Sequence, residues 1–202
     1  MNNATVFVID DDKAVRDSLR WLIGSVGLPV ELFISARAFL DSGRTDRPGC
    51  IVVDVRMPGI SGLDLQDELV RRGIDLPLIV ITAHGDVRMA VRAMKAGAIE
   101  FIEKPINDQQ FLDAVQKAVA KSLAAQTDRM YRTELRRRLA GLTARERQVL
   151  DLVVAGRPNK VVAHELAISE KTVEAHRARI MIKMAAKSFA ELVREVMLAG
   201  RS

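Results

Sequence analysis

Cysteine, histidine and aromatic residues are scarce in this chain of 202 residues. Cys50 is the only cysteine, so an intrachain disulfide is excluded, and its place beside an apolar run predicts an ordinary core residue. The three histidines, His84, His164 and His176, are isolated from one another and match no zinc-binding spacing. A metal site built from cysteine or clustered histidine is therefore not expected.

Long apolar runs are also missing. No run approaches the roughly 20 residues that a membrane-spanning helix needs. The first residues, 1–4, place no basic segment ahead of an apolar block, so no signal peptide is predicted. We therefore expect a cytoplasmic protein without a membrane partner.

Charge is divided unevenly along the chain. Residues 1–120 carry 14 Lys+Arg and 17 Asp+Glu, whereas residues 121–202 carry 17 and 9. The length suggests one or two domains. An acidic or neutral domain followed by a basic one fits both observations, and the basic part indicates a nucleic-acid partner.

Short apolar runs alternate with helical patterns through the first 120 residues. Strands are predicted at 5–9, 30–34, 51–53, 78–81 and 99–102. The helices between them begin at capping side chains and end near glycines. Five βα units predict an α/β fold with a doubly wound parallel sheet, of the flavodoxin-like kind.

Asp54 ends the most continuous apolar run. A buried strand seldom ends in a carboxylate without a reason, because an unpaired buried charge is costly. The alternative is an ordinary turn or helix-cap aspartate, and Asp54 alone does not decide between the two.

The other strand ends carry polar residues as well. They are Asp10, Asp11 and Asp12 after the first strand, Thr82 after the fourth and Lys104 after the fifth. Because the carboxyl ends of parallel strands meet at one edge, we expect these side chains to converge. Clustered carboxylates need a cation, oxygen ligands suit Mg²⁺, and a lysine and a hydroxyl beside them suit a phosphoryl group.

With these residues at these strand ends, residues 1–122 resemble the receiver domain of two-component response regulators. The resemblance implies that Asp54 accepts a phosphoryl group from a sensor histidine kinase. The implied Mg²⁺ ligands are Asp10, Asp11, Asp54 and the backbone carbonyl of Arg56. Asp12 is expected to cap the next helix, and His84 to be a loop residue near the site.

The same resemblance implies a conformational switch. Lys104 matches the lysine that bonds the phosphoryl group, and Thr82 and Phe101 match the residues that move inward after phosphorylation. The Lys104–Pro105 bond resembles the cis peptide of the family. The helix after Thr82, with Val87, Val91 and Lys95 near its surface, would then become a dimer face.

Residues 123–140 are predicted to form a helical linker. One face could pack on a partner, or the segment could be a solvated charged helix, and both readings remain open. Residues 141–202 predict an all-α domain of four helices, in which Thr143 and Glu146 fit a capping box. The second and third of these helices form a predicted helix-turn-helix.

A specific string strengthens this interpretation: Leu142-Thr143-x-Arg145-Glu146-x-x-Val149-Leu150, Asn159-Lys160, Thr172-Val173-x-x-His176 and Ile180-x-x-Lys183-Met184. It resembles the LuxR-type DNA-binding domain. Together with the receiver, the chain is similar to the FixJ/NarL class of transcription regulators, and within that class to the FixJ branch.

The resemblance implies that residues 170–184 form a recognition helix in the major groove. The positions at which family members contact bases are Glu174, Ala175 and Ala178, and candidates for base or phosphate contacts are Asn159, Lys160, Lys171, Thr172, His176, Arg177 and Arg179. Glu174 could accept a hydrogen bond from cytosine or pair with Lys171 or Arg177 on the helix face, and the pair is favoured. His176 can also be structural.

The whole chain thus predicts a regulator that is phosphorylated, dimerises and binds promoter DNA, with RNA polymerase as a candidate further partner. Its chemistry would be limited to its own phosphorylation and dephosphorylation, so it is not expected to be an enzyme. Two alternatives remain. A metal-dependent phosphatase could use an aspartyl nucleophile among residues 10–12, but lacks a later strand that ends in an acid pair. A phosphorylation-independent DNA-binding regulator would leave the receiver residues unexplained.

Overall fold

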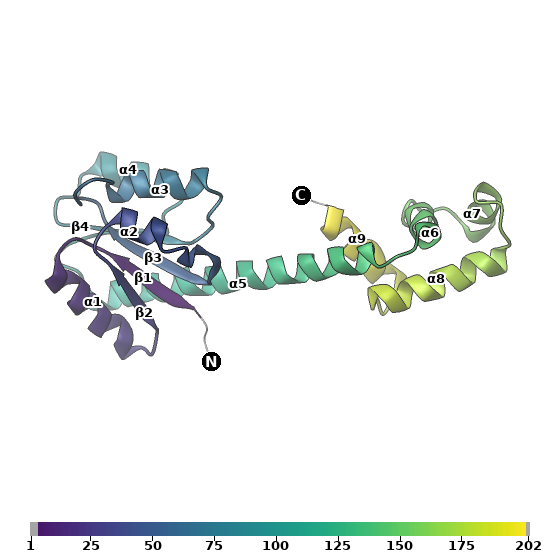
Figure 1. Cartoon of the computed structure of the whole chain (residues 1–202), viewed down its shortest axis with the longest axis horizontal. Helices are drawn as coiled ribbons and strands as arrows, with labels where there is room; N and C mark the ends of the chain where they lie inside the picture. The colour runs from purple at the N-terminus through teal and green to yellow at the C-terminus, as the bar shows by residue number, and fades with distance from the viewer. Residues whose placement is uncertain (1–3, 201–202) are drawn as a thin grey trace. The chain divides into compact units, whose positions relative to one another are not determined.

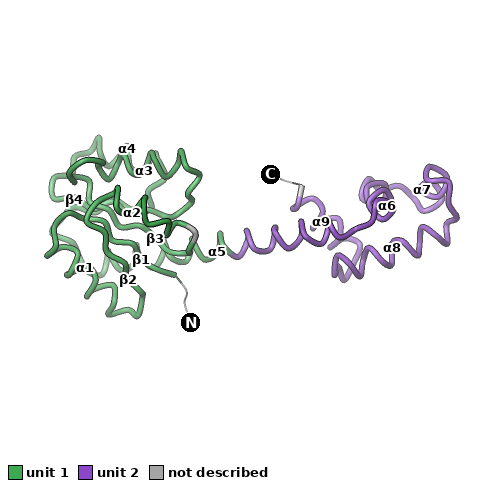
Figure 2. Tube along the Cα trace, in the orientation of Figure 1, with its two compact units in different colours: residues 1–126 green, residues 127–202 purple. Residues whose placement is uncertain are grey.

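The computed structural model describes residues 4–200, and the chain divides between Gln126 and Thr127 into two compact units (Figure 2). Over residues 4–200, no helix combines the length and the apolar character that crossing a bilayer requires.

The first unit is built on a five-stranded sheet. Its strands are β1 (Thr5–Ile9), β2 (Val30–Phe33), β3 (Gly49–Asp54), β4 (Leu78–Thr82) and β5 (Glu100–Glu103). All neighbours pair in parallel, in the order β2-β1-β3-β4-β5. The predicted doubly wound α/β fold is confirmed.

Helices cover both faces of this sheet (Figure 1). One face packs on α1 (Lys13–Ser25) and the start of α5 (Asp108–Ala140). The other packs on α2 (Ala36–Asp41), α3 (Gly62–Arg71) and α4 (Val87–Lys95), and the short 3₁₀ turn η1 (Arg44–Asp46) precedes β3. Alternate residues of the buried strands supply the two cores, as expected for a sheet covered on both sides.

The third strand is longer than its apolar run predicted. It begins at Gly49, opposite Thr5, and ends at Asp54, opposite Ile81. Hydrogen bonding to two neighbours extends the strand beyond the apolar residues, so the Asp54 carboxylate belongs to the sheet edge. The chain then returns closely at Gly62, where a Cβ atom would lie 2.3 Å from the Asp54 carbonyl oxygen.

Helix starts in the first unit follow the predicted caps. The Asp12 carboxylate accepts a hydrogen bond from the Ala14 amide at 2.7 Å, so Asp12 is the N-cap of α1. Ser61 and Asp86 cap α3 and α4 in the same way. Since Ser61 caps the helix that follows β3, Asp54 is left free for another role.

The second unit contains the end of α5 and α6 (Ala144–Val154), α7 (Asn159–Glu165), α8 (Glu170–Met184) and α9 (Phe189–Gly200). Their apolar faces share one core, and Thr143 and Glu146 form the predicted capping box. Leu135 of α5 is fully buried, whereas Met130 is 67% exposed. Arg138 of α5 also donates to the Met184 carbonyl at 2.8 Å, so residues 127–140 pack as part of this unit.

Candidate functional site

Three charged side chains from three strand ends meet at the carboxyl edge of the sheet. Lys104 Nζ donates to Asp10 Oδ2 at 2.9 Å and to Asp54 Oδ1 at 2.8 Å. Asp10 and Asp54 are 1% and 6% exposed. Two buried carboxylates therefore share one ammonium group, although the three residues are far apart in sequence.

Backbone amides bind the remaining oxygens of both carboxylates. Asp10 Oδ1 accepts from the Asp12 amide at 2.8 Å, and Asp54 Oδ2 accepts from the Arg56 amide at 2.6 Å. Asp54 thus accepts from a backbone amide two residues later, as an ordinary turn aspartate would, and it also takes part in the charged cluster. These bonds fix the orientation of both carboxylates.

The pKa values in this cluster reflect its burial. Burial raises the pKa of the Asp10 carboxyl above its ordinary value, against the opposing effect of Lys104. Burial also lowers the pKa of Lys104, but its bonds to Asp54 and Asp10 outweigh this, so the pKa lies above the ordinary value. Lys104 is therefore charged, and the Asp10 carboxylate carries a desolvation cost that a further cation would relieve.

The predicted Mg²⁺ ligands do not form a closed cage of side chains. Asp10 and Asp54 face Lys104, while Asp11 is exposed. Across residues 4–200, no three His, Cys, Asp or Glu side chains are arranged to hold a metal ion by themselves. The donor chemistry still fits Mg²⁺, which prefers oxygen and keeps several of its waters.

Arg16 was not predicted to belong to this site. It is buried on α1, and its Nη1 donates to the Asp10 carbonyl at 2.6 Å. Arg16 shares the inner face of the helix with Leu19 and Ile23, three and seven residues later. A charged residue in that apolar series was the signal that could have identified it.

Thr82 and Phe101 lie together beside the loop after β4. Thr82 is fully buried, and its Oγ1 accepts from the His84 amide at 3.2 Å. A Cβ atom on Gly85 would lie 3.0 Å from Phe101 Cε1 and 3.3 Å from Thr82 Cγ2. The hydroxyl and the ring of the predicted switch therefore contact the same loop, where the His84 side chain is exposed.

Polar contacts attach α4 to α3. Gln66 is 4% exposed and donates from Nε2 to the Ala93 carbonyl at 3.0 Å, and Arg92 pairs with Asp67 at 2.7 Å. The outward face of α4 exposes apolar side chains between basic ones, with Val87 80% and Val91 47% exposed. The helix is thus held to α3 by one buried and one exposed polar contact, and it leaves two valines uncovered.

In the second unit, most of the predicted DNA-contacting residues are exposed. They are Lys160 on α7 and Lys171, Thr172, Glu174, Ala175, Ala178 and Arg179 on α8. Thr172 is also part of the start of α8, where its amide donates to the Ser169 hydroxyl at 3.1 Å. One face of α8 therefore presents basic and small side chains to solvent.

The favoured pairing of Glu174 is wrong. Glu174 makes no ion pair with any residue of the described chain, and Arg177 instead donates from Nη1 to Asn159 Oδ1 at 2.7 Å. The Arg177 guanidinium also lies 5.0 Å from the centre of the Phe189 ring. Arg177 therefore contacts α7 and α9 rather than Glu174 on its own helix. His176 is half-buried, and its Nδ1 is buried without a hydrogen-bond partner in residues 4–200.

An ion pair between a buried glutamate and an exposed lysine joins α6 to α8. Glu146 Oε2 lies 2.7 Å from Lys183 Nζ, with the Glu146 side chain 4% exposed. The bond to Lys183 and the bond from the Thr143 amide lower the pKa of Glu146 to about 2. The pair therefore remains ionised at neutral pH and links two helices of the domain.

Comparison with known proteins assigns a family to each unit. The response regulator receiver domain matches residues 6–116, and the luxR family of bacterial regulatory proteins matches residues 140–196. The transcriptional regulatory protein FixJ of Azorhizobium caulinodans is 52% identical over 195 residues, covering 96% of this chain and 92% of that protein. The transcriptional regulatory protein TdiR of Thauera aromatica is 47% identical, covering 97% and 86%.

Solved structures agree with this assignment. The response regulator StyR has a TM-score of 0.88 at 46% identity, covering 96% of this chain and 98% of that one. Full-length FixJ from B. japonicum has a TM-score of 0.60 at 42% identity, covering 99% and 98%. Both likenesses extend over both units.

Proposed function

The chain belongs to the FixJ-like response regulators, which join a receiver domain to a luxR-type DNA-binding domain and regulate transcription, and from this premise we propose that phosphorylation of Asp54 is its switch. The observation that carries the proposal is the contact of Lys104 with both Asp10 and Asp54 at the sheet edge. The phosphatase alternative is not supported. It needs an acid pair at the end of a strand after Lys104, and β5 is the last strand in residues 4–200.

In the proposed reaction, an Asp54 carboxylate oxygen attacks the phosphorus atom of a phosphohistidine on a sensor kinase. The oxygen–phosphorus bond forms, the phosphorus–nitrogen bond breaks, and the histidine nitrogen keeps the electron pair and takes up a proton. Lys104 is already hydrogen-bonded to Asp54, so it can follow the negative charge onto the phosphoryl oxygens. Asp54 is held by the Arg56 amide throughout.

Mg²⁺, when bound, would neutralise charge on the phosphoryl oxygens. The residues that would hold it are Asp11, Asp10, Asp54 and the carbonyl of Arg56. Asp11 is exposed and makes no ion pair in the described chain, which leaves its carboxylate available. Asp10 supplies a carboxylate whose buried charge favours a nearby cation.

The signal would then pass from Asp54 to α4. Thr82 would exchange its contact with the His84 amide for the phosphoryl group, and Phe101 would move with it, because both side chains contact the Thr82–Gly85 loop. A rearranged α4 would offer Val87, Val91 and Lys95 to a second receiver. Apolar area already exposed on α4 supports a dimer face there.

The dimer would place two copies of α8 on promoter DNA. The exposed basic residues of the second unit support phosphate contacts, which give most of the affinity, while Glu174, Ala175 and Ala178 would face bases. RNA polymerase would be a further partner at the promoter. Catalysis would be restricted to the chain's own phosphorylation and dephosphorylation.

The test compares the wild type with Asp54→Asn and with Asp75→Asn, an exposed aspartate of the same unit as the matched control. Light-scattering mass is measured in Mg²⁺ before and after acetyl phosphate. We expect wild type and Asp75→Asn to shift from monomer to dimer and Asp54→Asn to remain unchanged. A phosphoryl group on Asp54→Asn, or an identical mass shift in that variant, would contradict the proposed switch.

A further inference from the structure

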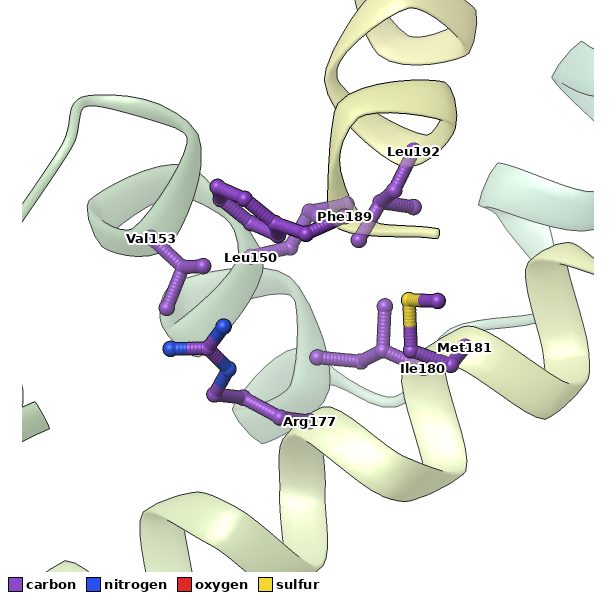
Figure 3. A pocket seen from close by; sticks show the side chains of 7 residues that line it. All are labelled: Leu150, Val153, Arg177, Ile180, Met181, Phe189 and Leu192. Atoms are coloured by element: carbon purple, nitrogen blue, oxygen red, sulfur yellow. The ribbon is translucent and has the colours of Figure 1, made fainter. Parts of the chain in front are cut away.

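The basic residues of α8 are not equivalent. Lys171 and Arg179 are exposed, whereas Arg177 is half-buried and turned toward the core of the second unit. Figure 3 shows its guanidinium among side chains of α6 and α9. These side chains line an apolar cavity of about 150 Å³. Arg177 lines this cavity together with Leu150, Val153, Ile180, Met181, Phe189 and Leu192.

Two specific contacts hold the guanidinium in this position. Nη1 donates to Asn159 Oδ1 at 2.7 Å, and the group stacks on Phe189 at 5.0 Å from the ring centre. Asn159 is the first residue of α7, and Phe189 is the first residue of α9. Turning Arg177 toward a phosphate would break a charge-assisted hydrogen bond and a cation–π contact together.

The contact with Arg177 also fixes which way Asn159 presents its amide. A guanidinium has only donors, so the atom of Asn159 that faces Arg177 must be the carbonyl oxygen. The Asn159 NH₂ group makes no hydrogen bond within residues 4–200 and is not among the buried unpartnered atoms, so it is open to solvent and to a ligand. Asn159 is followed directly by the exposed Lys160.

We infer that Arg177 is a positioning residue that turns the Asn159 amide toward the DNA backbone, so that Asn159 and Lys160 contact phosphate and Arg177 does not. The inference rests on the proposed DNA binding and deepens it, because it assigns different roles to residues that the sequence placed in one set. The two residues differ chemically. Arg177 acts through the neutral NH₂ donor of Asn159, whereas Lys160 acts through its own positive charge.

The salt dependence of DNA binding separates these roles. Each phosphate neutralised by a cationic side chain adds about one unit to the slope of log affinity against log salt concentration. We would measure fluorescence anisotropy of full-length protein, in Mg²⁺ and beryllofluoride, on a labelled mixed-sequence duplex of roughly 30 base pairs, about three turns. The variants are Arg177→Met, Arg177→Gln, Asn159→Ala and, as the charge control, Lys160→Ala.

We expect Lys160→Ala to lower the salt slope by about one unit. Arg177→Met should weaken binding about tenfold at every salt concentration, the loss expected for one hydrogen bond to a charged acceptor, with the slope unchanged. Arg177→Gln keeps a neutral donor for Asn159 Oδ1 and should restore most of the affinity. In the double variant Asn159→Ala/Arg177→Met, affinity should equal that of Asn159→Ala, since both changes remove one contact.

Several results would overturn the inference. A slope lowered by about one unit in Arg177→Met, without rescue by glutamine, would make Arg177 a direct phosphate contact. Wild-type affinity in Arg177→Met would remove its role altogether. Additive losses in the double variant would show that Arg177 does not act through Asn159.

Two controls keep the outcome interpretable. Thermal melting identifies a variant that is unfolded, and if Arg177→Met is, then Arg177→Gln and Asn159→Ala carry the same comparison. Failure of the wild type to bind the duplex would overturn the proposed DNA binding itself. If the wild type binds and Arg177→Met binds with the same affinity, only the inference about Arg177 would be overturned.

Discussion

The two units bury charged side chains in different ways. In the receiver, Asp10, Asp54 and Lys104 come from three strands and meet at one point. In the DNA-binding unit, charged groups instead join pairs of helices, as buried Glu146 does through Lys183 and half-buried Arg177 does through Asn159. The chain therefore contains one convergent charged site and a set of separate structural links.

The difference explains why only one of these arrangements favours a ligand. Two carboxylates share one ammonium in the receiver, so negative charge remains uncompensated, and burial, with the nearby Asp54 charge, raises the pKa of Asp10 despite Lys104. The Glu146–Lys183 pair is balanced, and the pKa of Glu146 is lowered to about 2. Burial thus raises the energy of charge at the functional site, while partners stabilise charge at the structural links.

The largest effect is expected from the same substitution made once in each unit. Lys104→Met should slow phosphorylation by acetyl phosphate at least about 100-fold, because the cationic side chain that bonds both carboxylates is lost. Lys183→Met should leave that rate unchanged and lower the free energy of unfolding by about 3 kcal/mol, because Glu146 is left buried and unpaired. Gel separation of the phosphorylated form and urea denaturation measure the two quantities. Equal slowing by Lys183→Met would erase the contrast between the units.

A second pair of substitutions tests whether each buried carboxylate stabilises or destabilises its unit. In metal-free protein at neutral pH, Glu146→Gln should lower the free energy of unfolding by about 2 kcal/mol, since a charge-assisted bond and a helix cap are weakened. Asp10→Asn should leave the stability unchanged or raise it, because a desolvated carboxylate is removed while Lys104 keeps Asp54. Hydrogen exchange of peptides from each unit reports the two effects separately. Destabilisation of equal size by Asp10→Asn would contradict the proposed cost of the receiver site.

The pH dependence should show the same opposition. The pKa of Glu146 lies near 2, against an ordinary value of 4.5, so its stabilising effect is present above pH 4.5 and is lost as the pH falls toward 2. The pKa of Asp10 is raised, so its ionisation lowers the stability of the metal-free receiver as the pH rises through the folded-state pKa. Glu146→Gln should reduce the loss of stability at acid pH in the second unit only, as measured by hydrogen exchange at several pH values.

A smaller effect should come from Arg16, which supports the receiver site from behind. Arg16→Met should weaken Mg²⁺ binding about tenfold, because the carbonyl of Asp10 loses the donor that holds the acidic loop. Arg20→Met, an exposed arginine on the same helix, is the matched control. Titration of Mg²⁺ followed by Trp21 fluorescence or calorimetry gives both affinities. Equal affinities in the two variants would remove Arg16 from the site.

The contrast between the units also decided what the sequence could predict. Asp10, Asp54 and Lys104 were predictable as neighbours because parallel strands bring their carboxyl ends to one edge, which depends only on topology. The capping residues Asp12 and Thr143 were predictable because caps act within one turn. The rule of alternating strands and helices was enough to place the receiver site.

Links between helices could not be predicted in this way. Its place on the recognition helix predicts that Arg177 contacts DNA, but its contacts to Asn159 and Phe189 depend on how three helices pack. Helical spacing pairs Glu174 with Lys171 or Arg177, and for Arg177 that rule fails because its guanidinium bonds Asn159 instead. Gln66 gave no signal, since its contact with the Ala93 carbonyl depends on the approach of α3 to α4.

The smallest expected effect distinguishes two glutamates with the same pKa. Bonds to Arg137 and Arg138 lower the pKa of Glu134 to about 2, the value that Glu146 also has. The Glu134 side chain is 37% exposed, whereas that of Glu146 is 4% exposed. Solvent and salt screen the first pair, so Glu134→Gln should change the melting temperature slightly at low salt and not measurably near 1 M NaCl, where charges are screened within about 3 Å. Glu146→Gln should remain destabilising at both salt concentrations, because the Glu146 carboxylate is buried and also accepts a hydrogen bond from the Thr143 amide. Equal salt sensitivity of the two variants would mean that burial does not set the strength of these two ion pairs. The contrast between the units would then rest only on the convergence of charges in the receiver.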